Sequence, residues 1–155
     1  MIPVQRLNHA VLYVRDAAAS AQWYSEVFGF EIISELPGGA AAFLRAAGTD
    51  NHHDLGLFTV GAGAPGPERG RVGLYHLAWQ VGSVTDLVEA RRVLVERGAY
   101  AGESDHGASK SLYGHDPDGN EFEILWAVPR EDWGAYDHDA VVRPLDLDAE
   151  VTRYG

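Results

Sequence analysis

The sequence lacks several features, and each absence excludes a class of protein. There is no cysteine, so disulfides, thiolate metal sites and cysteine nucleophiles are excluded, and any metal must be held by nitrogen and oxygen. Lys110 is the only lysine and the net charge is −11, which argues against a nucleic-acid partner because phosphate backbones are repelled. No apolar run approaches the roughly 18 residues that cross a bilayer, and no charged-then-apolar leader is present, so we expect a cytoplasmic protein with no membrane partner.

What is present has the composition of one folded domain. The chain has 155 residues, of which 46% are apolar and 23% charged, so it is long enough and apolar enough to bury a core. The run Leu7–Val14 resembles the run Leu74–Val81, and each has a histidine at its third position, His9 and His76. The sequence therefore predicts an internal duplication within a single domain, residues 1–155.

Both halves of the duplication predict the same order of elements. A stretch with apolar residues at helical spacing follows each histidine run, and it ends at Gly29 in the first half and at Gly98 in the second. Short strand patterns then follow at residues 31–34, 41–45 and 55–60, and again near residues 99–102, 109–113 and 121–126. The predicted fold class is α+β, with two βαβββ modules that form paired curled mixed sheets around a metal cavity.

Composition also predicts where the modules begin and end. Module 1 covers about residues 1–62, a Gly/Pro-rich linker covers about residues 62–70, and module 2 covers about residues 71–127. The acidic tail, about residues 128–155, is predicted to wrap over the body as an extended segment, with a disordered end as the alternative.

The two duplicated histidines and one strand carboxylate indicate a metal site. Because the repeat gives His9 and His76 the same register, a symmetric fold would place both in one cavity. Glu123 lies between Phe122 and Ile124, and a carboxylate buried in such an apolar alternation needs a positive partner, which a metal ion supplies. Each residue alone is more simply explained as a core or surface residue. Together, two histidines and one carboxylate suit Fe(II) or another first-row divalent ion and leave coordination positions open.

The first module has no obvious counterpart of Glu123. Glu123 lies 47 residues after His76, and Leu55 lies 46 residues after His9, so we align Leu55 with Glu123 and expect an open face on the metal. His53 lies two residues before Leu55 on the same predicted strand face, which makes it a candidate acid–base group. The alternative is that His52 and His53 begin a strand at the surface.

Tyr113 is a further candidate. It lies ten residues before Glu123, on the neighbouring predicted strand across an Asp-Pro-Asp-Gly turn. That pairing would bring its hydroxyl near the open face of the metal, and ordinary strand packing explains its position equally well.

These residues resemble the vicinal-oxygen-chelate superfamily and, within it, the type I extradiol (catechol 2,3-dioxygenase-like) ring-cleavage dioxygenases. The segment from Asp116 to Glu123 is shared by the whole superfamily, whereas the His52-His53 pair and the segment from His106 to Tyr113 are more specific. The resemblance covers nearly the whole chain and rests on residues 8–9, 52–58, 75–79, 106–113 and 116–123. Many family enzymes carry an additional N-terminal pair of modules, and this sequence has one pair.

The resemblance implies an enzyme that opens a catechol-type ring with O2, in aromatic compound catabolism. It implies His9, His76 and Glu123 as ligands of Fe(II), Mn(II) or another first-row divalent metal. It also implies His53 as the acid–base residue, with Tyr113 and His106 as groups that hydrogen-bond substrate and oxygen intermediates. The implied partners are a small-molecule diol and O2, and the chain is expected to form a dimer or a higher homo-oligomer.

Two other functions on the same fold stay open. A glyoxalase- or epimerase-like lyase or isomerase needs one or two carboxylates at the metal as bases, and Leu55 at the position aligned with the second carboxylate argues against it. A metal-free ligand-sequestering protein has no need of three ligand residues, so their presence argues against that function.

Overall fold

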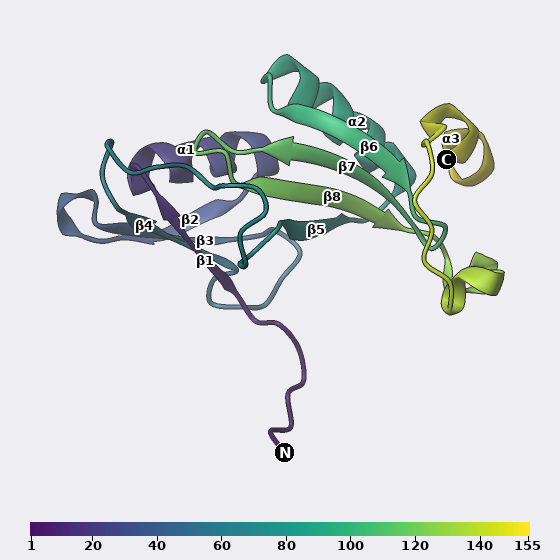
Figure 1. Cartoon of the computed structure of the whole chain (residues 1–155), viewed down its shortest axis with the longest axis horizontal. Helices are drawn as coiled ribbons and strands as arrows, with labels where there is room; N and C mark the ends of the chain where they lie inside the picture. The colour runs from purple at the N-terminus through teal and green to yellow at the C-terminus, as the bar shows by residue number, and fades with distance from the viewer. The chain divides into compact units, whose positions relative to one another are not determined.

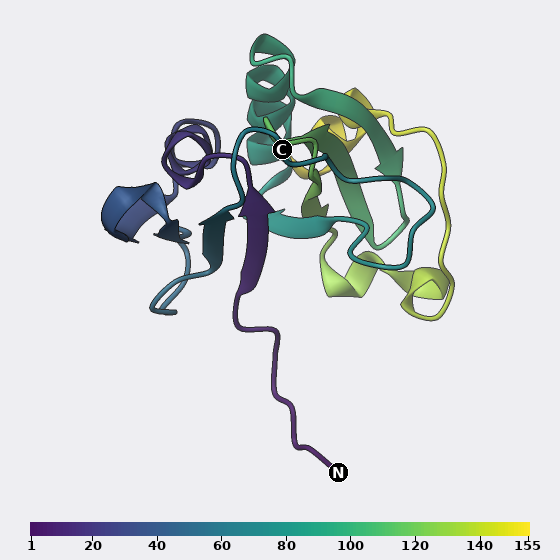
Figure 2. The same cartoon turned by 60° about the vertical axis from the view of Figure 1, so that its left-hand side comes forward.

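The computed structural model describes all 155 residues and divides into two compact units, Met1–Pro67 and Glu68–Gly155 (Figures 1 and 2). Each unit contains one open four-stranded mixed sheet with an α-helix packed on it, so the fold is α+β as predicted. No helix in the structure combines the length and apolar character needed to cross a bilayer.

The first unit has the strand order β1-β4-β3-β2, with β1 parallel to β4 and the other pairs antiparallel. Its elements are β1 (Ala10–Val14), α1 (Ala17–Phe28), β2 (Glu31–Glu35), a 3₁₀ turn (Pro37–Gly39), β3 (Ala41–Arg45) and β4 (Leu55–Thr59). Asp16 caps α1 by accepting hydrogen bonds from the backbone of its first turn, and Gly29 ends the helix with φ 68°. The helix covers one face of the sheet, where its Tyr24 joins fully buried strand leucines.

The second unit repeats this order as β5-β8-β7-β6, again with one parallel pair, β5 and β8. Its elements are β5 (Leu77–Val81), α2 (Val84–Glu96), β6 (Tyr100–Asp105), β7 (Ser109–His115), β8 (Glu121–Ala127), two 3₁₀ turns (Arg130–Asp132 and Gly134–Asp137) and α3 (Leu147–Tyr154). Ser83 caps α2, and α2 packs on all four strands. The predicted duplication is therefore visible in the topology, because both sheets place their first and last strands side by side.

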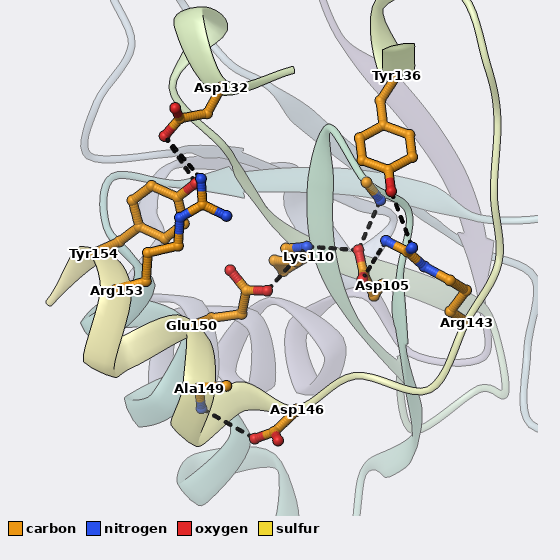
Figure 3. Close-up of polar contacts among 11 residues, drawn as sticks. Asp105, Lys110, Asp132, Tyr136, Arg143, Asp146, Ala149, Glu150, Arg153 and Tyr154 are labelled. Carbon is orange, nitrogen blue, oxygen red and sulfur yellow. Dashed lines mark hydrogen bonds and ion pairs between the residues drawn. The ribbon is translucent and has the colours of Figure 1, made fainter. Parts of the chain in front are cut away.

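The tail differs from its prediction, because residues 147–154 form the helix α3 and not an extended segment. Asp146 caps this helix by accepting a hydrogen bond from the backbone nitrogen of Ala149 (Figure 3). Eight residues are too few to be stable as an isolated helix in water. Tertiary contacts hold it: the ring of Tyr154 lies 5.1 Å from that of Trp126, and Glu150 is 3.1 Å from the ammonium of Lys110. Sequence periodicity does not show such contacts.

Candidate functional site

Strand register shows which residue of the first unit is equivalent to Glu123. In the second unit Ala78, two residues after the strand histidine, pairs with Glu123. In the first unit Val11, two residues after its histidine, pairs with Gly56. The equivalent of Glu123 is therefore Gly56, and the alignment of Leu55 with Glu123 was wrong by one residue.

The one-residue correction reverses the face on which Leu55 lies, because successive strand residues point to opposite sides. Leu55 pairs with Ala10 and corresponds to Phe122, and both side chains are buried in the core, with exposures of 0% and 1%. Leu55 therefore contributes to packing. Glycine has no side chain, so the first unit offers no carboxylate at the position equivalent to Glu123.

In the second unit the structure brings together three of the predicted site residues. The Nε2 atom of His76 lies 3.1 Å from Oε2 of Glu123, and Glu123 is buried, with an exposure of 8%. Tyr113 pairs with Glu123 across β7 and β8, and its ring centroid lies 5.8 Å from that of His76. One imidazole nitrogen and one buried carboxylate oxygen thus converge beside a phenol.

This pair fits a divalent metal. The donors are nitrogen and oxygen, which first-row ions accept, and a buried carboxylate needs a compensating charge. The other ring nitrogen of His76, Nδ1, is buried without a hydrogen-bond partner, and its nearest acid is Glu121 at 3.6 Å. No set of three His, Asp or Glu side chains is gathered as a metal site in the structure, and His9 belongs to the other unit.

In the first unit His53 lies against His9, with ring centroids 4.6 Å apart, and against Phe43 at 5.2 Å. The strand β4 begins at Leu55, so His53 belongs to the loop before it and not to the strand itself. Burial, followed by the neighbouring His9 and His52, lowers the pKa of His53 below its usual value of 6.5, against an opposing influence of Asp54. The lowered pKa favours the neutral imidazole, which is the form that accepts a proton.

His106 and Tyr113 form a hydrogen-bonded pair. The Nε2 atom of His106 lies 2.7 Å from the hydroxyl of Tyr113, and its Nδ1 lies 2.9 Å from the carbonyl oxygen of Val141. A carbonyl only accepts, so Nδ1 carries the hydrogen, and the Nε2 of a neutral His106 accepts from the Tyr113 hydroxyl. Burial, followed by the carboxylate of Glu123, raises the pKa of Tyr113 to about 12, so this hydroxyl keeps its proton near neutral pH.

Val141 shows that the tail contributes to this pair, which the sequence did not indicate. The tail is fixed near His106 by a two-hydrogen-bond bridge between Asp105 and Arg143, with backbone distances of 2.9 and 3.0 Å, and by an ion pair at 2.8 Å (Figure 3). Lys110, only 5% exposed, joins Asp105 at 2.6 Å to Glu150 of α3. Burial alone would raise the pKa of Asp105, but hydrogen bonds from Lys110 and the Gly107 backbone lower it.

A known protein family and several known proteins are similar to this chain over most of its length. The family model described as Glyoxalase/Bleomycin resistance protein/Dioxygenase superfamily matches residues 6–124. Biphenyl-2,3-diol 1,2-dioxygenase 3 of Rhodococcus globerulus is 35% identical over 136 residues, which cover 84% of this chain and 70% of that protein. Catechol-2,3-dioxygenase of Bacillus subtilis (strain 168) is 34% identical over 128 residues, 82% of this chain and 43% of that protein. The chain thus spans less than half the length of the second relative.

Solved structures share the fold. A glyoxalase/dioxygenase from Nostoc punctiforme has a TM-score of 0.66 at 24% identity, covering 83% of this chain and 97% of its own. A lactoylglutathione lyase from Agrobacterium tumefaciens has a TM-score of 0.60 at 25% identity, covering 81% and 96%. A fosfomycin resistance protein from Listeria monocytogenes has a TM-score of 0.62 at 20% identity, covering 83% and 98%. Proteins with different activities share this architecture, so the fold alone does not specify the reaction.

Proposed function

Because the chain belongs to the Glyoxalase/Bleomycin resistance protein/Dioxygenase superfamily, we propose that it is a metal-dependent extradiol dioxygenase-like enzyme that opens a catechol-type aromatic ring with O2. The observation that carries the proposal is the 35% and 34% identity to two proteins named as diol and catechol dioxygenases. The residues of the candidate site support it, because they offer two imidazoles, a carboxylate, a neutral histidine and a protonated phenol.

The proposed metal ligands are His9 in the first unit and His76 and Glu123 in the second. The metal is Fe(II) in the first instance, with Mn(II) or another divalent first-row ion as the alternative. Support comes from the 3.1 Å approach of His76 to Glu123 and from the burial of that carboxylate. Such an ion, when bound, would hold the two adjacent oxygens of a diol and supply the route for electrons from the ring to O2.

The surrounding residues are assigned to proton transfer. His53, with its lowered pKa, is the proposed base that takes a proton from a substrate hydroxyl. Tyr113 donates its hydrogen to Nε2 of His106, so its oxygen keeps lone pairs with which to accept a hydrogen bond from substrate.

A lyase or isomerase is the competing function, because lactoylglutathione lyase from Agrobacterium tumefaciens shares the fold. Proton transfer beside a carbonyl uses carboxylate bases at the metal, and Gly56 provides none at the position equivalent to Glu123. A metal-free binding protein is the other alternative. Assembly as a dimer or higher homo-oligomer is a separate prediction, which light scattering measures.

An oxygen-uptake experiment separates the three functions. The protein is purified without chelators under anaerobic conditions, its metal content is measured, and O2 consumption is followed with catechol and biphenyl-2,3-diol. We expect about one divalent ion per chain and diol-dependent oxygen uptake that Glu123→Ala abolishes. Metal without oxygen uptake, together with conversion of a glutathione hemithioacetal, would support the lyase. Tight diol binding by metal-free protein would support the binding protein.

A further inference from the structure

A line of side-chain hydrogen bonds in the first unit leads from a buried carboxylate to His9. Asp54, 9% exposed, accepts a hydrogen bond from Nδ2 of Asn51 at 2.7 Å and one from the backbone of Ala46 at 2.9 Å. Asn51 in turn contacts Asn8 twice, and Oδ1 of Asn8 lies 2.8 Å from Nδ1 of His9. The side chain next to the proposed ligand is therefore tied to the interior of the unit.

The carboxylate of Asp54 sets which amide atoms of Asn51, and then of Asn8, donate and which accept. A carboxylate only accepts, so Asn51 must turn its amide nitrogen towards Asp54, and the same nitrogen donates to the backbone carbonyl of Asn8 at 2.9 Å. The amide oxygen of Asn51 then faces outward, where it accepts from Nδ2 of Asn8 at 3.1 Å and from Arg6 at 2.7 Å. Asn8 is thereby oriented with its oxygen towards His9.

An amide oxygen also only accepts, so the Nδ1 atom of His9 must carry a hydrogen. We propose that Asn8 and Asn51 are positioning residues that hold His9 in the Nδ1–H tautomer, so that the lone pair of Nε2 is the one offered to the metal. Ligating histidines generally donate their second ring N–H to such an acceptor, which fixes both the tautomer and the ring orientation. The proposal deepens the proposed function and rests on it for the role of His9 as a ligand.

Asp54, which sets the orientation of the Asn51 amide, is held firmly in place. The orientation of the Asn8 side chain is therefore maintained although Asn8 and His9 lie at the surface of the unit. The backbone of Asp54 accepts from Ala10 at 2.9 Å and donates to Leu44 at 2.8 Å, so the residue is fixed to β1 and β3 at once. Its carboxylate is buried, and Asn51, which donates a hydrogen bond to it, is only three positions away in the sequence. Asn8 directly precedes His9, so little chain is free to relax between them.

The tautomer is measured directly by ¹⁵N NMR of the metal-free full chain with labelled histidine, because the shift of a ring nitrogen depends on whether it carries hydrogen. A His9→Ala sample assigns the signal. We expect Nε2 of His9 to be unprotonated in the wild type and both tautomers to be populated in Asn8→Ala. Asn8→Asp no longer donates to Asn51 but still accepts from Nδ1, so it should keep the hydrogen on Nδ1. Gln22→Ala, which removes a surface amide bonded to Glu26 on α1, is the matched control.

Metal affinity provides the second readout. Calorimetric titration with Mn(II) should show binding about 10- to 100-fold weaker in Asn8→Ala and near wild type in Asn8→Asp and Gln22→Ala. A hydrogen on Nε2 in the wild-type protein, or an Asn8→Ala variant that keeps both tautomer and affinity, would overturn the proposal. Oxygen uptake is scored separately: a wild type that shows the expected tautomer and Mn(II) affinities but consumes no O2 with any diol would defeat the proposed function alone.

Discussion

Two adjacent substitutions in β4 test the register on which the candidate site depends. Gly56→Glu introduces a carboxylate at the position equivalent to Glu123, on the opposite side of the strand from Leu55. Leu55→Glu introduces the same group one residue earlier. The two variants add the same charge to the same strand and place the carboxylate on opposite faces.

The structure gives the two changes very different effects on stability. Leu55 is fully buried, so Leu55→Glu loses about 2 kcal/mol of apolar burial and adds the larger cost of an unpaired buried carboxylate. That sum is a large part of the roughly 5–15 kcal/mol by which domains are stable. At Gly56 a new Cβ would lie 3.4 Å from Val11 and 3.5 Å from Phe43, close to ordinary contact. Gly56 is itself buried, so Gly56→Glu also carries the cost of a buried carboxylate when no metal binds it, but it removes no apolar side chain and should destabilise the protein less than Leu55→Glu.

Thermal unfolding and metal titration measure both effects. Leu55→Glu should be unfolded or strongly destabilised. Gly56→Glu should fold and bind the metal at least ~10-fold more tightly (about 1.4 kcal/mol). It should also lose oxygen uptake, because the new carboxylate would fill the coordination position proposed for substrate or O2. Gly56→Gln, which is similar in size but uncharged, is the control for bulk. A folded Leu55→Glu with tightened metal binding, beside a Gly56→Glu that binds metal as the wild type does, would refute the register argument.

The remaining predictions concern the metal ligand, the base and the tail. Glu123→Ala should reduce metal content to near zero, because two neutral imidazoles leave the charge of the ion uncompensated; stoichiometric metal would contradict the assignment. His53→Phe should keep its metal and lose about 100-fold or more in turnover, with the smallest loss on an electron-poor catechol; loss of the metal would make His53 a ligand instead. The pKa of Asp105 is lowered, so its contribution to stability is fully present above its unfolded pKa, near 3.8, and is lost as the pH falls through the folded value. Urea unfolding of Asp105→Asn should therefore show a weaker dependence on pH in this acidic range, and an unchanged dependence would show that the lowered pKa contributes no stability.

The fold was predictable because the same order of strand and helix patterns occurs twice in the sequence. Glycines at residues 29 and 98 end the helices or follow them closely, and both have positive φ, so a local chemical signal coincides with the structure there. The strands of both halves fall within a few residues of their predicted bounds. The tail helix was not predictable, since α3 depends on Lys110 and Trp126, which lie more than 20 residues away in the sequence.

The strand register of the candidate site was readable from the sequence, although the spacing used for Leu55 missed it by one residue. Gly56 lies 47 residues after His9, as Glu123 lies 47 residues after His76, so equal spacing gives the pairing that the strands show. Leu55, at 46 residues, lies on the opposite face of the strand. The link between His106 and Val141 spans 35 residues, and the link between Asn8 and Asn51 spans 43. No short-range pattern marks such hydrogen bonds, because they depend on how the chain returns to the same edge of its sheet.

The glycine at residue 56 also bears on the choice between ring cleavage and proton transfer. The atoms nearest to its missing Cβ belong to Val11 and Phe43, and the ring of Phe43 packs edge-on against Phe58 at 5.9 Å. The strand face beside His9 is therefore apolar where a lyase would need a second base. An aromatic ring would gain from contact with such a face through apolar burial and edge-to-face packing. The residues around Gly56 therefore support the proposed substrate class, a diol on an aromatic ring.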